Sequence, residues 1–187
     1  MEIRLARNLQ PDSIVDGKGI RTVIWTQGCS HNCKGCHNPE THSFSAGFLI
    51  DTGEIKKQIK ELKWQDGITL SGGDPLFQID ACLDISEFCQ NIGLNVWCYT
   101  GFTFEELLER SKKEEKLHKL LQNIDVLVDG KFIEEQKSLN LYFKGSKNQR
   151  ILNLKESLKY QKPIEIEEYK KEKEFKPYTR TNNGIYV

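Results

Sequence analysis

Short apolar runs alternate with helical patterns along most of this chain, and this alternation limits its fold more than any other feature. The runs cover residues 21–28, 67–73, 94–101 and 124–130, and Gly or Asp bounds them. Runs of this length that are rich in Val, Ile, Leu and aromatic residues are typical of strands buried on both faces. With helices between them, they predict a parallel α/β fold with right-handed crossovers.

The helices are predicted from capping residues and apolar stripes. Asp51, with Glu54 three residues later, is typical of an N-cap and opens the first helix. A second helix is expected over residues 79–91, where apolar residues form a stripe. Thr103 and Glu106 match a capping box, which predicts a third helix over the leucines that follow.

The length limits how far such a fold can close. A chain of 187 residues is short for a barrel of eight strand–helix units, so we expect an incomplete barrel or an open sheet. We expect the main domain over residues 1–160. Residues 161–187 begin with a mostly charged stretch and predict a solvated or disordered tail, with a docking segment for a partner as the alternative.

Charge and hydropathy exclude several settings. The 27 Lys and Arg residues balance the 27 Asp and Glu residues, so net charge gives no reason to expect nucleic acid or an anionic membrane as a partner. No stretch approaches the ~20 apolar residues of a membrane helix. Charged residues also stand where a secretory signal needs its apolar run, so we expect a cytoplasmic protein.

The six cysteines fall into two sets. Three form a C-x3-C-x2-C motif in the loop after the first predicted strand: Cys29, Cys33 and Cys36. In a reducing compartment, such spacing indicates a metal or redox site rather than disulfides. The others are scattered over a predicted helix and strand: Cys82, Cys89 and Cys98. The two on the helix share one face and are expected to be buried as small hydrophobic residues.

Two metal sites fit the clustered motif at this point, because thiolates bind zinc as well as iron–sulfur clusters. A structural zinc ion needs four ligands, and His31, His37 or His42 could complete the set. A [4Fe–4S] cluster held by three cysteines instead leaves one iron open for a substrate.

A second motif, residues 71–75 with the sequence Ser-Gly-Gly-Asp-Pro, ends the next predicted strand. The two glycines expose strand-end carbonyl groups and Asp74 adds a carboxylate, so together they can accept hydrogen bonds from an ammonium group. Gly-Gly and Asp-Pro also occur in ordinary strand-to-helix turns, so the motif alone establishes no ligand. In parallel α/β folds, functional residues lie at these carboxyl ends of the strands.

The order of the two motifs resembles the radical S-adenosylmethionine superfamily. More closely, the chain resembles the family of activating proteins of anaerobic ribonucleoside-triphosphate reductases. Several stretches between about residues 10 and 152 carry this resemblance: 16–21, 27–39, 71–76 with 97–101, 126–132 and 145–151. The resemblance implies the partial TIM-type barrel of the radical S-adenosylmethionine fold.

The resemblance also implies two cofactors and the residues that bind them. A [4Fe–4S] cluster would be held by the clustered thiolates: Cys29, Cys33 and Cys36. S-adenosylmethionine would bind the open iron, and its amino group would meet three acceptors: Gly72, Gly73 and Asp74. Its adenine would lie beside residues of the cysteine loop: Gly35, Cys36 and His37. Its ribose and carboxylate would meet Asp129 and Lys131, with Asn148 as a further candidate.

The implied activity is the activation of a partner enzyme. A low-potential donor such as flavodoxin or ferredoxin would reduce the cluster, and cleavage of S-adenosylmethionine would give a 5′-deoxyadenosyl radical. That radical would take a Cα hydrogen from a glycine of anaerobic ribonucleoside-triphosphate reductase, leaving a glycyl radical there. The alternatives are an activator of pyruvate formate-lyase or another glycyl radical enzyme and, from a different class, a zinc-stabilised binding module.

Overall fold

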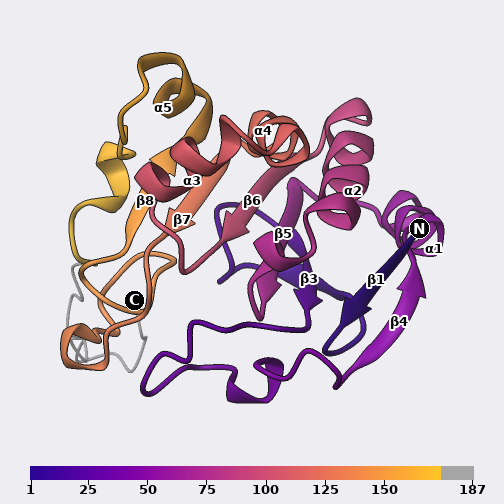
Figure 1. Ribbon diagram of the computed structural model, residues 1–187, viewed down its shortest axis with the longest axis horizontal. Coiled ribbons are helices and arrows are strands. Elements are labelled where there is room, and N and C mark those ends of the chain that lie inside the picture. Colours follow the sequence, from indigo (N-terminus) through magenta and orange to yellow (C-terminus); the bar gives the residue numbers. More distant parts are fainter. Residues whose placement is uncertain (174–187) are drawn as a thin grey trace, which may run out of the picture.

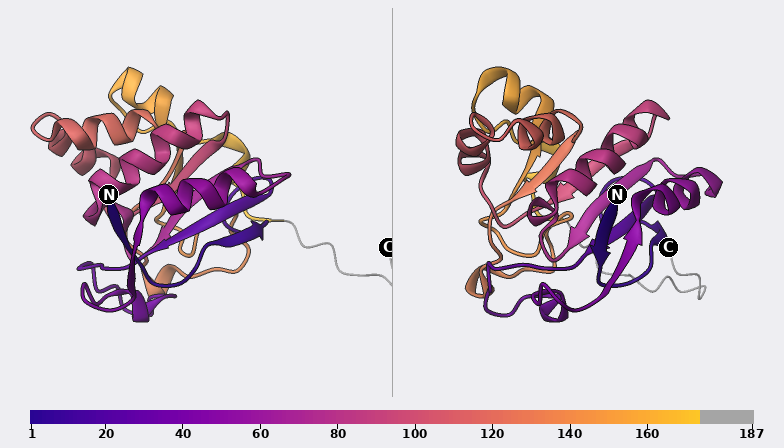
Figure 2. Two further views of the ribbon diagram at one scale, coloured as in Figure 1. Left: turned by 90° about the vertical axis from the view of Figure 1, so that its right-hand side faces the viewer. Right: turned by 45° about the vertical axis from the view of Figure 1, so that its right-hand side comes forward.

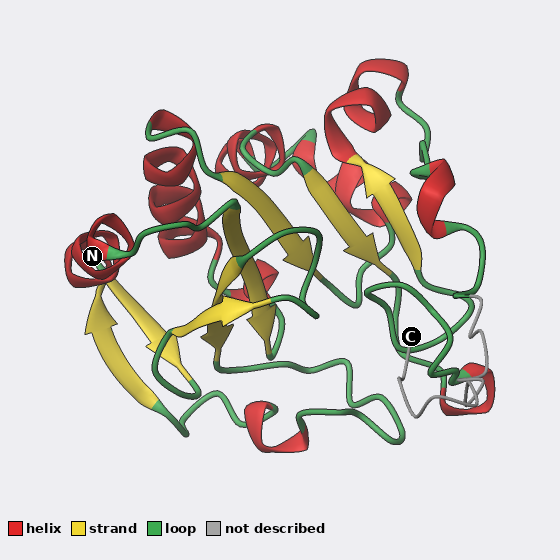
Figure 3. Ribbon diagram, turned by 180° about the vertical axis from the view of Figure 1, so that it is seen from behind, coloured by secondary structure: helices red, strands yellow, loops and turns green. Residues whose placement is uncertain are grey.

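Four parallel strands form the centre of the sheet in the computed structural model, which describes residues 1–173 (Figure 1). They are β3 (Arg21–Thr26), β5 (Gly67–Gly72), β6 (Asn95–Tyr99) and β7 (Val126–Asp129). Each pairs in parallel with the next, so their carboxyl ends share one edge. The loops that follow the strands gather on that side (Figure 3). The four predicted strands are therefore confirmed.

Antiparallel strands, which the apolar runs did not predict, flank this centre. They are β1 (Glu2–Leu5), β2 (Gln10–Ser13), β4 (Phe48–Asp51) and β8 (Arg150–Asn153). The strand order is β4-β1-β3-β5-β6-β7-β8, with β2 paired to β3. The described strands end at two separate edges and do not close into a ring, which confirms the incomplete barrel.

The α-helices cover one face of the sheet (Figures 1 and 2). They are α1 (Thr52–Glu61), α2 (Ile79–Asn91), α3 (Phe104–Ser111), α4 (Glu115–Gln122) and α5 (Leu154–Tyr160). In the described part of the chain, four 3-10 turns lie in the loops: η1 (Pro39–Thr41), η2 (Pro75–Phe77), η3 (Glu134–Gln136) and η4 (Glu167–Tyr169). Within residues 1–173, none of the helices combines the length and apolarity that a membrane crossing requires.

The predicted caps are present at the first and third helices. The Asp51 carboxylate accepts from the Gly53 backbone N–H, and Thr103 and Glu106 form the reciprocal capping box. The leucines after that box lie on two helices rather than one, because the chain leaves the helix after Ser111 and begins α4 at Glu115.

The two faces of the central strands carry different side chains. On the helix-covered face, aliphatic residues such as Ile24, Leu70 and Leu127 form the main core, together with Cys82, Cys89 and Cys98. A second cluster includes two aromatic residues, Trp97 and Tyr169, beside strand residues Val126, Val128 and Ile151. Alternation along each strand therefore separates an aliphatic outer core from the surface that faces the candidate site.

The first part of the expected C-terminal tail runs back along β8. Leu152 and Glu165 form an antiparallel bridge, and the Ile166 N–H donates to the Ile151 carbonyl at 2.9 Å. Tyr169 is only 6% exposed, and its ring centroid lies 5.4 Å from that of Phe143. Residues 161–173 are thus attached to the sheet. The rest of the expected tail, residues 174–187, lies outside the described residues, and the domain boundary at residue 160 stays a prediction.

Replacing Tyr169 with alanine is expected to lower the free energy of unfolding by roughly 3 kcal/mol, because it empties a buried aromatic site. The midpoint of urea unfolding of the cluster-free protein measures this change. Tyr160 is 53% exposed, so Tyr160→Ala is the matched control and should change stability by less than about 0.5 kcal/mol. Equal midpoints for the two variants would contradict the anchoring role of Tyr169.

Candidate radical cofactor site

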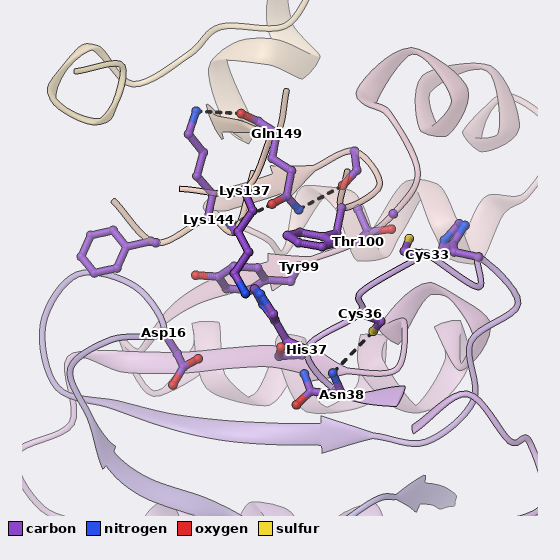
Figure 4. Close-up of a pocket in the computed structure, with 18 of the residues that line it drawn as sticks. Asp16, Cys33, Cys36, His37, Asn38, Tyr99, Thr100, Lys137, Lys144 and Gln149 are labelled. Carbon is purple, nitrogen blue, oxygen red and sulfur yellow. Dashed lines mark hydrogen bonds between the residues drawn. The ribbon is translucent and has the colours of Figure 1, made fainter. Parts of the chain in front are cut away.

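A cavity of about 470 Å³ opens at the carboxyl ends of the parallel strands. The cysteine loop after β3 lines one part of it, and the ends of β5 and β6 line the floor. The loop between β7 and β8 supplies another wall with residues such as Phe132, Phe143 and Lys144. Figure 4 shows Cys33 and Cys36 to one side of Tyr99, with Lys144 on the opposite loop.

The three clustered cysteines are half-buried and all line this cavity: Cys29, Cys33 and Cys36. The base of their loop is closed by two backbone hydrogen bonds, from Gly28 N–H to the Thr41 carbonyl at 2.8 Å and from Cys29 N–H to the His42 carbonyl at 3.1 Å. The loop therefore presents its thiols from a fixed base, directly after a buried strand.

Burial and backbone donors act in opposite directions on these thiols. Partial desolvation raises the pKa of Cys29 and of Cys36, and backbone N–H groups of His31 and Asn38 offset part of that rise. The Asn38 N–H lies 3.5 Å from the Cys36 sulfur. N–H groups directed at sulfur also stabilise bound thiolates and tune the reduction potential of an iron–sulfur cluster.

The donor set fits a [4Fe–4S] cluster. Each thiolate of such a cluster binds a different iron, so the sulfurs need not converge on one point. Among residues 1–173, no three Cys, His, Asp or Glu side chains converge closely enough to share a single metal ion. His31, one candidate for a fourth zinc ligand, directs Nε2 at the Asp74 carboxylate 2.7 Å away instead.

The strand-end glycines line the cavity beside the cysteine loop. Gly72 adopts φ +106°, a conformation that side chains rarely adopt. A Cβ on Gly73 would overlap the Gly28 carbonyl oxygen and lie 2.9 Å from its carbonyl carbon. These two residues therefore let the end of β5 and the start of the cysteine loop approach each other, which leaves room for a ligand over the strand ends.

Asp74 is placed differently from its glycine neighbours. Its side chain is 1% exposed, and Oδ2 accepts from Thr100 Oγ1 at 2.8 Å and from the Gly101 N–H at 2.9 Å. Its Oδ1 accepts from the Leu76 N–H at 2.9 Å, and its carbonyl accepts from the Phe77 N–H. Donors from the protein thus occupy the carboxylate that was expected to accept from an amino group. Asp74 does not itself line the cavity, but it binds Thr100 and Gly101, which do.

Two expected adenine neighbours lie at the outer end of the cysteine loop. The His37 ring lines the cavity and stands 4.8 Å from the Phe132 ring, centroid to centroid. Gly35 has φ +69° and lies against the Glu134 side chain, outside the cavity wall. Of the two, only His37 presents a side chain to the ligand space.

The remaining three predicted residues meet in an adjoining cavity of about 400 Å³: Asp129, Lys131 and Asn148. Gly101 and Gly130 line both cavities. The Asp129 carboxylate pairs with Arg150 and accepts from the Phe104 N–H at 2.8 Å. Asn148 donates to the Lys131 carbonyl at 2.8 Å, while its buried Oδ1 has no hydrogen-bond partner among the described residues. A ligand donor would satisfy this acceptor.

Tyr99 and Lys144 line the cavity and were not among the predicted site residues. Burial raises the pKa of Tyr99, which stands at the carboxyl end of β6 where functional residues are expected. Burial also lowers the pKa of Lys144, whose ammonium donates to the Gln149 carbonyl at 2.8 Å. Lys144 follows no strand end, and the sequence pattern held no signal for it.

The thiols of the cluster-free protein should divide into two reactivity classes. Iodoacetamide is expected to modify the half-exposed cavity thiols: Cys29, Cys33 and Cys36. The core thiols of Cys82, Cys89 and Cys98 should react only after unfolding, because they are fully buried. Desolvation also raises the pKa of each of them, and it raises that of Cys89 to about 12. Peptide mass spectrometry with and without urea measures the pattern, and labelling of Cys98 in the folded protein would contradict it.

Comparisons with known proteins match most of the chain. The family model described as a 4Fe-4S single cluster domain matches residues 15–152. An anaerobic ribonucleoside-triphosphate reductase-activating protein from Haemophilus influenzae is 37% identical over 154 residues, which cover 78% of this chain and 95% of that relative. The chain belongs to this family of activating proteins.

A second relative supports the same family assignment. The protein of the same name from Vibrio cholerae is 38% identical over 75% of this chain and 92% of its own length.

Among solved structures, the crystal structure of QueE from Escherichia coli has a TM-score of 0.46 and 14% identity, and covers 55% of this chain and 53% of that chain.

Membership of this activating-protein family confirms the family resemblance and the iron–sulfur cofactor predicted from the sequence. The family description names the 4Fe-4S cluster, and S-adenosylmethionine as the second cofactor stays a prediction. The zinc-stabilised binding module is thereby overturned, since the matching domain is that of a 4Fe-4S cluster.

Proposed function

We propose that this protein activates an anaerobic ribonucleoside-triphosphate reductase by forming a glycyl radical on it. One structural observation supports the proposal independently of the names of the protein's relatives. Three half-buried thiols and two strand-end glycines line the same cavity, which is open to solvent on one side. That arrangement suits a cluster, a second cofactor beside it and a protein loop that enters from outside.

The chain's own groups hold and orient the cofactors. When bound, the reduced cluster and S-adenosylmethionine supply the radical chemistry that removes a Cα hydrogen from a glycine of the partner. Cys29, Cys33 and Cys36 hold the cluster, and the carbonyl groups of Gly72 and Gly73 accept from the amino group. His37 and Phe132, whose rings lie together in the cavity wall, would stand beside the adenine and shield it from water.

The adjoining cavity takes the rest of the second cofactor. Asn148 offers its unpartnered Oδ1 to a ribose hydroxyl, and Lys131 supplies positive charge for the carboxylate. Asp129, held by Arg150, fixes the loop that carries both residues. We place the protein in the cytoplasm, because reduced clusters need a reducing compartment, and we name flavodoxin or ferredoxin as the class of electron donor.

Anaerobic reconstitution with iron and sulfide tests this function. The reduced protein is mixed with S-adenosylmethionine, and 5′-deoxyadenosine is measured by chromatography. Adding an anaerobic ribonucleoside-triphosphate reductase should then produce a stable organic radical on that enzyme, detected by electron paramagnetic resonance. A parallel mixture with pyruvate formate-lyase is the matched control and should stay without a radical.

The outcomes separate the parts of the proposal. A radical on pyruvate formate-lyase alone would overturn the choice of partner and retain the chemistry. Absence of 5′-deoxyadenosine from protein with an intact, reduced cluster would overturn the chemistry itself.

A further inference from the structure

His31 stands between two of the cluster cysteines and lines the cavity, with its Nε2 directed at Asp74. Its side chain is 8% exposed, whereas His37 and His118 are exposed residues. Its Nε2 lies 2.7 Å from Asp74 Oδ2. Because a carboxylate only accepts hydrogen bonds, Nε2 carries the proton and donates it. The cysteine loop is thereby tied to the residue that follows Gly72 and Gly73.

Asp74 connects three loops through one carboxylate. Besides His31 it accepts from Leu76 in its own loop and from Thr100 and Gly101 after β6. Three of these donors, from His31, Thr100 and Gly101, converge on Oδ2, and the Leu76 N–H reaches Oδ1. At 1% exposure, a lost donor is not replaced by bulk water, so each contact matters to the geometry of the whole set.

The His31 imidazole also packs closely against its neighbours. Its ring lies 4.6 Å from the Phe102 ring in an edge-on arrangement and 5.7 Å from the Phe77 ring. A Cβ on Gly101 would overlap the imidazole, so the absence of a side chain there lets the ring in. The hydrogen bond and the aromatic contacts together fix the position of residue 31 between Cys29 and Cys33.

We propose that His31 is a positioning residue, whose buried contact with Asp74 sets the distance between the cluster thiols and the strand-end carbonyls that receive the amino group of S-adenosylmethionine. This inference rests on the proposed function. The two ligand sites belong to different loops, after β3 and after β5, and the His31–Asp74 contact is a side-chain tie between them. Loss of the tie should affect how the second cofactor meets the cluster more than whether the cluster forms.

The test compares His31→Ala with His31→Gln in the reconstituted holoenzyme. Glutamine can still donate to Asp74, so it should retain the wild-type response, whereas alanine cannot. For His31→Ala we expect an iron content near that of the wild type. The S-adenosylmethionine concentration that produces half of the change in the electron paramagnetic resonance spectrum of the reduced cluster should be about tenfold higher. The KM for S-adenosylmethionine should rise by a similar factor.

His118→Ala is the matched control, because His118 is an exposed histidine on α4, outside the residues that line either cavity. Combining His31→Ala with Asp74→Asn should cost less than the sum of the two single changes, since both remove the same contact. Additive effects, an unchanged spectral midpoint in His31→Ala, or equal losses in His31→Ala and His31→Gln would each overturn the positioning role. Failure of the proposed function is distinct, because the wild type itself would then give no spectral change with S-adenosylmethionine.

Discussion

Replacing Cys33 with alanine is expected to abolish the cleavage of S-adenosylmethionine and to lower the iron content of the reconstituted protein. Cys33 is the middle thiol of the loop and lines the cavity with Cys29 and Cys36. A cluster with only two protein thiolates loses a ligand that no neighbouring cysteine can replace, since the remaining described cysteines are buried in the core. Iron analysis and chromatography of 5′-deoxyadenosine measure both effects.

Cys82→Ala is the matched control for this experiment. Its thiol is fully buried in the helix-side core, so the substitution removes a small packed group and should leave most of the cleavage intact. Equal losses in Cys33→Ala and Cys82→Ala would contradict the assignment of the cluster to the loop after β3.

Adding one methyl group at Gly73 is expected to reduce cleavage by roughly a hundredfold. The new Cβ would overlap the backbone of Gly28, the residue directly before Cys29. Backbone atoms cannot rotate away as a flexible side chain can, so the cysteine loop must move relative to β5. A displacement of the order of 1 Å in a reacting geometry costs about a hundredfold in rate. The measurement is the rate of 5′-deoxyadenosine formation per bound cluster.

Gly93→Ala provides the control for the methyl group itself. Gly93 has φ +81° and nothing within 4 Å of the added Cβ, in the turn between α2 and β6. The substitution should cost roughly 1 kcal/mol of stability through backbone strain and leave the rate per cluster unchanged. If Gly73→Ala behaves like Gly93→Ala, the close approach of β5 to the cysteine loop has no role in the reaction.

The sequence was sufficient for the parts of the fold that depend on local pattern. Buried central strands such as β3 and β5 lie in short runs rich in apolar residues, and the capping box of α3 is predicted from two residues. The flanking strand β2 lacks such a run, and β4 has only three apolar residues before Asp51; most residues of both strands are exposed. Their pairing depends on neighbours distant in the chain, which a local pattern does not contain.

The site, too, could be predicted from the sequence only where it depends on local pattern. The sequence predicted site residues where they end a strand or follow it directly, as Gly72 and Gly73 do, and the structure brings these together with the cysteine loop. The direction of a side chain was not readable. Asp74 faces protein donors because His31 and Thr100 arrive beside it from other loops. Such a meeting depends on tertiary arrangement rather than on spacing.

The pairing of residues 164–166 with β8 has a consequence for solubility. β8 is an end strand of the sheet, and the C-terminal segment occupies its outer backbone groups through the bridge between Leu152 and Glu165. Unpaired edges of this kind recruit strands from other molecules. A chain shortened to residue 160 would uncover that edge, and we expect it to self-associate more readily than the full chain. We therefore expect residues 164–166 to protect the edge of the sheet against aggregation.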